Sequence, residues 1–250
     1  MDRTKSNIPF VGLHAHCGVG SPFDGLGYPN EHMDYAFQNG NDALALTDHG
    51  NMNGFAYQVQ HAQTMMKEGK DFKPVFGVEA YFLPSINEWR EQLEKAKADK
   101  KAKKGIDKSQ AGTTIEDEST KREVKNILNR RRHLILLAQN QTGLNNIFAL
   151  VSKSYSEDNF YRFPRMDYKT LCEHSEGVIA ASACLGGIYA GNYWENIDQG
   201  DDAVLAAMRE ATENMVSVFG DRWYGELQWN NIKEQHHLNQ LIIKVCDEYD

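Results

Sequence analysis

Short apolar runs alternate with longer segments of helical periodicity along most of this chain. The clearest run is 73–82, where Pro74 opens a stretch rich in valine and aromatic residues. Between the runs, apolar residues recur at three- and four-residue spacing, and Asn30 and Gly40 have the chemistry of a helix start and stop. The pattern predicts strands at 9–13, 43–47, 73–82, 133–138, 177–181 and 223–228, and helices at 30–40, 52–68, 142–155, 200–219 and 232–249.

Strands that alternate with helices of this length favour an α/β fold with a parallel sheet of roughly six strand–helix units. Polar candidate residues stand at or near the strand ends, which is typical of a TIM-like barrel rather than an open sheet. A chain of 250 residues is long enough for one large α/β domain or two small ones. Residues 86–131 interrupt the pattern because they are rich in Lys and Glu and have a polar middle, and they predict an inserted pair of exposed helices joined by a mobile loop.

Composition narrows the class of protein. The chain has 250 residues, 41% of them hydrophobic, and a mean hydropathy of −0.60, with no apolar stretch near membrane-spanning length. Residues 1–6 lack the apolar segment of a signal peptide, and the four cysteines are scattered without a CxxC pair. These features predict a cytoplasmic protein with free or metal-bound thiols.

Charge is unevenly distributed. The net charge of −8 argues against a simple nucleic-acid binder. However, six lysines lie between Lys95 and Lys104 against the single acid Asp99, and three arginines follow at 130–132. The lysines could contact a phosphate backbone, although a solvated helix face accounts for them more simply.

His14 and His16 end the first apolar run. On a strand, side chains at i and i+2 point to one side, so both imidazoles could reach one divalent cation. Two surface histidines that lie close together by chance would show the same spacing. The pair alone does not distinguish a metal site from such a chance pair.

Other residues add to this pair with unequal weight. Glu79 lies in an apolar run, where a buried carboxylate is costly unless it is paired or bound to metal, and its two oxygens could bridge two cations. The remaining candidates also have ordinary structural explanations. Asp24 could belong to a simple turn, and Asp48-His49 could belong to a capped turn. His133 could be a structural histidine, and Cys184 could be a buried thiol.

Taken together, these residues resemble the PHP (polymerase and histidinol phosphatase) domain family. More narrowly, the chain is similar to the polymerase branch of that family, the N-terminal PHP domains of bacterial DNA polymerase III α subunits. The resemblance runs from about residue 8 to 250. It is carried by Leu13-His14-Ala15-His16, Ser21-x-x-Asp24-Gly25, Ala45-Leu46-Thr47-Asp48-His49-Gly50-Asn51-Met52-x-Gly54, Pro74-x-x-Gly77-x-Glu79-x-Tyr81, the runs 133–144, 163–167 and 182–187, and Tyr224-Gly225-Glu226-Leu227-Gln228.

The resemblance implies an irregular (β/α)7 PHP barrel with up to three divalent metal ions at the strand ends. The family's last motif, an Asp-x-His after the final helix, does not occur in these residues. We therefore expect a partial PHP domain over 1–250 that lacks its last barrel strand or strands. Such a fragment could be a truncated chain, a split gene product or part of a larger polypeptide. The implied metal ligands are His14, His16 and Glu79 for the first ion, Glu79, His133 and Cys184 for the second, and Asp24 and His49 for the third.

The resemblance leaves several functions open. One is part of a DNA-directed DNA polymerase, a nucleotidyltransferase, with metal-dependent 3′–5′ exonuclease proofreading. There Glu79 would bridge metals and Asp48 would orient the attacking water or a ligating histidine. The second is an inert scaffold that stabilises the polymerase and binds a proofreading subunit. The third is a histidinol-phosphatase-like phosphoesterase.

A metal amidohydrolase, which also begins with an HxH pair, fits less well because no strand end offers a bridging lysine. The expected cofactors are Zn²⁺ or Mn²⁺, with the soft Cys184 favouring Zn²⁺. The expected partners are DNA and replisome subunits, namely a proofreading subunit and, through the rest of the polymerase, a sliding clamp. No membrane is expected.

Overall fold

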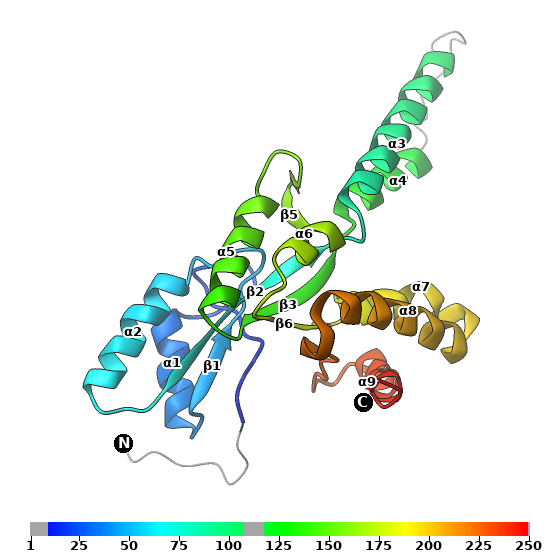
Figure 1. Ribbon diagram of the computed structural model, residues 1–250. Coiled ribbons are helices and arrows are strands. Elements are labelled where there is room, and N and C mark those ends of the chain that lie inside the picture. The colour runs from blue at the N-terminus through cyan, green and yellow to red at the C-terminus, as the bar shows by residue number, and fades with distance from the viewer. Residues whose placement is uncertain (1–9, 108–117, 250) are drawn as a thin grey trace.

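The computed structural model describes residues 10–107 and 118–249. A single mixed sheet forms its centre (Figure 1), with helices packed on its sides. The strands are β1 (Ala43–Leu46), β2 (Lys73–Phe82), β3 (Arg132–Ala138), β4 (Phe160–Tyr161), β5 (Phe163–Met166), β6 (Val178–Ala181) and β7 (Trp223–Tyr224). The helices are α1 (Pro29–Gln38), α2 (Phe55–Lys67), α3 (Ile86–Asp107), α4 (Glu118–Asn129), α5 (Gln141–Ser154), α6 (Tyr168–Glu173), α7 (Ile188–Asn196), α8 (Asp201–Phe219) and α9 (Lys233–Cys246), with short 3-10 turns η1 (Ile197–Gln199) and η2 (Gly220–Arg222).

The sheet order is β4-β5-β2-β3-β6-β7, and β1 also pairs with β2. The long strand β2 organises this sheet. Its first half runs parallel to β1, its last residues run parallel to β5, and its other edge pairs with β3. In the described part of the chain no strand covers the outer edge of β7, so the sheet is open, as expected for a partial α/β barrel.

The expectation of an all-parallel sheet is wrong for β3, which runs antiparallel to both β2 and β6. The reason lies in the connection between β2 and β3. Helices α3 and α4 form a hairpin that projects away from the sheet and returns the chain to the end that it left, so that Phe82 pairs with Arg132 (Figure 1). The first residue of β3 therefore lies at the same end of the sheet as the last residue of β2.

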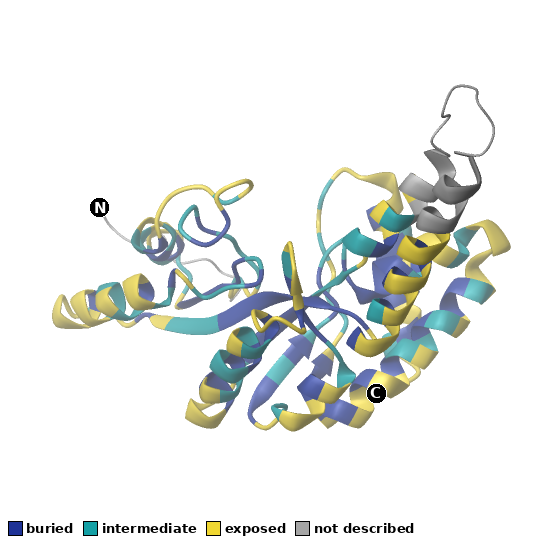
Figure 2. Ribbon diagram, turned by 90° about the horizontal axis from the view of Figure 1, so that it is seen from above, coloured by how far each residue is buried: buried dark blue, intermediate teal, exposed yellow. Residues whose placement is uncertain are grey.

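Alternation along β2 and β3 separates two faces. Val78 and Ala80 on β2, and Leu134 and Leu136 on β3, belong to the main core with α5, α7, α8 and α9. The opposite face holds a smaller cluster of Ala45, Ile135, Leu137 and Ala183. The central strands are buried, whereas the helices keep exposed outer faces (Figure 2). This smaller cluster lies on the face of the sheet from which Glu79 also projects, as the pairing of Glu79 with Ile135 requires.

The base of the α3–α4 hairpin is better packed than the exposed helices expected at 86–131. Trp89, Leu93 and Ile127 are buried together, and Trp89 Nε1 donates a hydrogen bond to the carbonyl of Ile127 at 2.7 Å. The expected loop at 108–117 lies outside the described residues.

Several expected boundaries need correction. Helix α1 begins at Pro29 after Tyr28, so Asn30 lies inside the helix rather than at its N-cap. From Phe10 the expected first strand makes only a single bridge, Gly12 to Leu44, and the expected strand at 223–228 ends at Tyr224. Elements β4, β5, α6 and α7 were not expected, because they are short and their periodicity is weak. In the described part of the chain, none of the helices combines the length and apolar character needed to cross a membrane.

Candidate metal centre

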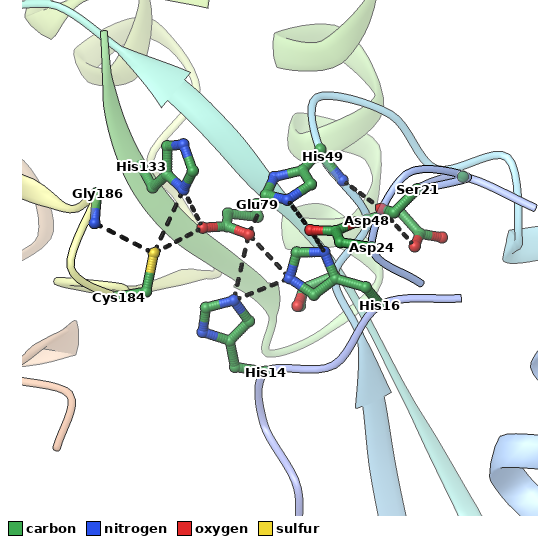
Figure 3. Close-up of polar contacts among 12 residues, drawn as sticks. His14, His16, Ser21, Asp24, Asp48, His49, Glu79, His133, Cys184 and Gly186 are labelled. Atoms are coloured by element: carbon green, nitrogen blue, oxygen red, sulfur yellow. Dashed lines mark hydrogen bonds and ion pairs between the residues drawn. The ribbon is translucent and has the colours of Figure 1, made fainter. Parts of the chain in front are cut away.

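Glu79 lies at the centre of a cluster of ligand-type side chains (Figure 3). Its carboxylate is fully buried near the end of β2. Oε1 lies 2.6 Å from Nδ1 of His133 and accepts from Sγ of Cys184 at 3.6 Å. Oε2 lies 2.9 Å from Nε2 of His16 and 3.2 Å from Nε2 of His14. The two carboxylate oxygens thus face two different sets of side chains.

His14 and His16 lie on the extended segment beside β1. Ala45 N donates to the carbonyl of Gly12 and Thr47 N to that of Ala15, which holds this segment along the strand. As their spacing predicted, the two imidazoles project to the same side, and their Nε2 atoms are 3.1 Å apart. Both nitrogens point at one volume next to Glu79, as ligands of a shared cation would.

Asp24 and His49 form the outer part of the cluster. His49 Nε2 lies 2.8 Å from Oδ2 of Asp24, and His16 Nδ1 lies 3.7 Å from the same oxygen. The Asp24 side chain is 52% exposed, which makes this the most open part of the cluster. His14, His16 and Glu79; His16, Asp24 and His49; and His49, Glu79 and His133 each have ligand atoms close enough together to hold one ion.

His133 and Cys184 reach Glu79 from neighbouring strands. His133 lies at the start of β3, which the reversed direction of that strand brings to the metal-centre end of the sheet. Cys184 follows β6, and the chain turns toward Glu79 through Ala183, whose φ of 60° lies in the left-handed region. Cys184 Sγ lies 3.4 Å from Nδ1 of His133.

Two buried histidine nitrogens in this cluster have the environment of metal ligands. Nδ1 of His16 and Nδ1 of His49 are buried and make no hydrogen bond to any described residue, although His49 Nδ1 lies 3.1 Å from Glu79 Oε2. A buried nitrogen without a partner is costly unless its lone pair is used. A mixed set of imidazole, thiol and carboxylate donors suits Zn²⁺ or Mn²⁺, so the residues fit a divalent metal.

Without a metal, the side chains of this cluster shift one another's pKa values strongly. Burial acts to raise the pKa of Glu79, but hydrogen bonds from His133, His14 and His16 outweigh it and hold that pKa far below its ordinary value. Burial acts to lower the pKa of His14, and its bonds to Glu226 and Glu79 raise it to about 10. Burial and the charge of Glu79 raise the pKa of the Cys184 thiol to about 12.

Asp48, a predicted catalytic residue, has a different set of contacts. Its buried carboxylate accepts from the backbone N of Cys17 at 2.8 Å, from Sγ of Cys17 at 3.0 Å and from Oγ of Ser21 at 2.9 Å. Ser21 Oγ in turn accepts from the backbone N of His49 at 3.0 Å. Asp48 therefore organises the 17–21 loop and, through Ser21, the backbone that carries His49.

The sequence analysis included Glu226 in a motif but gave it no role in the site. Its Oε1 accepts from Nδ1 of His14 at 2.7 Å and from Nε2 of Gln228 at 2.8 Å. The backbone N of Glu226 donates to Oγ of Ser182 at 2.9 Å, next to the turn that carries Cys184. The signal was the Glu-x-Gln spacing in the expected strand at 223–228, which places both polar side chains on one face.

Comparisons with known proteins identify the family of the chain. The model of the PHP domain family matches residues 12–230. The chain is 33% identical over 241 residues to the DNA polymerase III subunit alpha of Aquifex aeolicus, covering 96% of this chain and 17% of that protein. It is 30% identical to the Thermus aquaticus protein of the same name, covering 98% of this chain and 16% of that protein. The chain thus spans about a sixth of the length of these relatives and matches their N-terminal region.

Among solved structures, a Bifidobacterium adolescentis protein described as a metal-dependent phosphoesterase aligns with a TM-score of 0.40 at 13% identity, over 96% of this chain and 84% of that one.

Proposed function

Because the chain belongs to the PHP domain family, we propose that the centre around Glu79 holds divalent metal and hydrolyses a phosphodiester, the one at the 3′ end of a DNA strand. The observation that carries the proposal is that the two carboxylate oxygens of Glu79 face different sets of side chains. One of its oxygens faces His133 and Cys184, and the other faces His14 and His16. A carboxylate shared in this way could bridge the two ions of a two-metal hydrolytic site.

The proposed ligands form three sets, one for each metal ion. His14, His16 and Glu79 hold one ion, His133 and Cys184 join Glu79 on a second, and Asp24 and His49 hold a third together with His16. When bound, divalent ions stabilise the charge on phosphoryl oxygens and lower the pKa of water, so that a nucleophile forms near neutral pH.

The surrounding side chains position these ligands. Glu226 accepts the Nδ1 proton of His14, which fixes the tautomer that leaves Nε2 free to ligate. Asp48 is a positioning residue in this scheme, because it acts on His49 through Ser21. The exposure of Asp24 provides the side from which a polymeric substrate reaches the centre.

The DNA substrate and the setting rest on the relatives, which are named as DNA polymerase III alpha subunits. In this proposal the chain is a PHP domain that works beside a polymerase in the cytoplasm, in contact with DNA and other replisome subunits. The four cysteines are free, which agrees with a reducing compartment.

Metal content and end-specific cleavage together test the proposal. Purified chain is stripped with a chelator and reloaded with Zn²⁺ or Mn²⁺, and bound metal is measured by elemental analysis. The same samples are incubated with single-stranded DNA labelled at the 5′ end, so that stepwise shortening from the 3′ end appears as a ladder. We expect at least one bound ion per chain and a ladder that disappears on chelation.

Glu79→Gln is the decisive variant, because it removes the shared charge and keeps the volume. It should lose metal and activity together, whereas the exposed Glu91→Gln on α3 should retain both. Bound metal without any DNA shortening would contradict the nuclease proposal and favour the scaffold role. A folded chain that binds no metal would contradict the metal centre itself.

A further inference from the structure

Three consecutive arginines at 130–132 precede or open β3, and their side chains diverge. Arg130 Nη1 donates to Oε1 of Gln92 on α3 at 2.7 Å, and Arg132 forms an ion pair with Glu195 on α7. Arg131 is half-buried and has no acidic side chain within ion-pair distance in the described part of the chain.

The hydrogen bonds of Arg131 are incomplete. Its Nη1 donates to the backbone carbonyl of Asn129 at 2.8 Å, and its Nε is buried without a hydrogen-bond partner among the described residues. A guanidinium carries five N–H groups that all donate. Arg131 also forms a side-chain hydrogen bond with Tyr81. Its Nε is therefore the donor that remains for an acceptor outside the described residues.

Aromatic rings hold this guanidinium in place. Its Cζ lies 3.8 Å from the ring centroid of Phe163 and 5.1 Å from that of Tyr81. Stacking of this kind pre-organises an arginine and reduces the rotamer freedom that is lost when it binds a ligand.

The same tyrosine ring touches the metal centre. Tyr81 stacks on His49 with ring centroids 5.9 Å apart and planes 6° from parallel, and it meets His133 edge-on at 5.3 Å. Arg131 stands two residues before His133, and both side chains contact the ring of Tyr81. One aromatic ring thus separates the guanidinium from two proposed metal ligands.

Arg165, the other arginine near Phe163, cannot fill this role. It is fully buried, and it donates to the carbonyls of Leu128, Tyr161 and Phe163 at 2.6–3.1 Å. Its donors are used inside the protein, whereas Arg131 is half-buried and its Nε has no partner in the described part of the chain.

We propose that Arg131 is the anion-binding residue of the metal centre and donates to a non-bridging oxygen of the substrate phosphate. This inference rests on the proposed function, because it assumes that a phosphate ester occupies the centre. The planar fork of a guanidinium matches two phosphate oxygens. The substrate class it indicates is a phosphate oxyanion held beside His49 and His133.

Binding of inorganic phosphate tests the inference without relying on turnover. Its dissociation constant is measured by calorimetry for the metal-loaded chain and for Arg131→Met, Arg131→Lys and Arg130→Met, with metal content determined for each. Arg131→Met should bind phosphate roughly 10- to 100-fold more weakly with unchanged metal content, because a charge-assisted hydrogen bond is lost.

The two other variants separate charge, shape and position. Arg131→Lys should give an intermediate loss, because lysine keeps the charge but not the fork. Arg130→Met, one residue away, should bind like the unchanged chain. If Arg131 contacts the phosphate equally in the ground state and in the transition state, Arg131→Met should raise KM more than it lowers kcat in the DNA assay.

The failure of each idea has its own signature. Equal phosphate affinity in the unchanged chain and in Arg131→Met, with both folded by circular dichroism, would overturn the role of Arg131. An unchanged chain that binds metal but not phosphate would overturn it as well. If metal and phosphate bind with the predicted dependence on Arg131 but DNA is not shortened, the nuclease proposal fails and the anion site stands. If Arg131→Met does not fold, Arg131→Lys carries the test.

Discussion

His14 and Glu226 are 212 residues apart in the chain, yet Nδ1 of His14 lies 2.7 Å from Oε1 of Glu226. His14 belongs to the segment beside β1, which pairs with β2, and Glu226 follows β7, the last strand of the sheet order. Their contact joins the segment beside β1 to the chain that follows β7. It also leaves Nε2 of His14 directed at Glu79.

Glu226→Gln should weaken metal binding without changing a proposed ligand. An outer carboxylate that orients a ligating histidine contributes about 10- to 100-fold in metal affinity. Glutamine keeps the size but accepts the His14 proton less strongly, so we expect a loss in this range, measured by competition with a chromophoric chelator. Glu210→Gln, on the exposed side of α8, is the matched control. Equal affinities in both variants would show that Glu226 does not support His14.

Metal binding at pH 7 should release protons. In the metal-free chain the pKa of His14 is about 10 and that of Cys184 about 12, so both carry a proton at pH 7. Ligation requires neutral imidazole and thiolate, so the ion on His14 should displace one proton and the ion on Cys184 another. Titration of metal into weakly buffered chain with a pH indicator measures both.

Cys184→Ser should reduce this proton release by one equivalent and leave the share of His14 unchanged. A thiol that coordinates a metal loses its proton, whereas a serine hydroxyl that interacts weakly with the metal keeps its proton. Metal uptake with no proton release would show that His14 and Cys184 are already deprotonated in the metal-free chain, and would contradict the prediction.

Ala183→Val should destabilise the chain and disturb the turn before Cys184. Ala183 has a φ of 60° and is buried in the small cluster below the metal centre. A β-branched residue is strongly disfavoured at this backbone angle, and the added methyl groups enlarge a buried side chain, so we expect a loss of about 1–3 kcal/mol in the free energy of unfolding.

Urea unfolding of the metal-free chain measures this loss. Ala98→Val provides the control, because Ala98 is exposed on α3 and should cost no more than about 0.7 kcal/mol from helix propensity. If the two variants unfold at the same urea concentration, the backbone at Ala183 is not under the constraint described.

Arg165→Met should destabilise the base of the α3–α4 hairpin. Arg165 is fully buried, donates to the carbonyl of Leu128 at the end of α4 at 2.6 Å, and packs 4.4 Å from the ring of Trp89. Methionine fills much of the volume but leaves several carbonyls without donors, so we expect a loss of about 3 kcal/mol or more.

Arg90→Met is the matched surface variant. Arg90 also links α3 to the segment before β4, through its ion pair with Asp158 at 2.7 Å, but both side chains are well exposed. Exposed ion pairs contribute about 0–1 kcal/mol, so urea unfolding should separate the two variants clearly. A small loss in Arg165→Met would mean that the carbonyls find other donors.

The local pattern of apolar residues was sufficient to predict the elements that have strong periodicity. The bounds of β2 were predicted at 73–82, and those of α5, α8 and α9 within a few residues, because each carries its own apolar spacing and end signals. Elements β4, β5 and α6 were missed, since two to six residues carry too little periodicity to be distinguished from loop.

The sequence by itself also supplied the ligand-type residues from which a metal centre was predicted. Glu79 in an apolar run and the i, i+2 spacing of His14 and His16 are local features, and the structure brings both together. Only the tertiary structure decided the direction of β3, which follows from where the α3–α4 hairpin returns the chain and which carries His133 to Glu79. It alone also decided the contact of Glu226 with His14 and the place of Arg131 behind Tyr81. The reason is physical: periodicity records which face of an element is buried, whereas partners far apart in sequence are selected by how the finished elements pack.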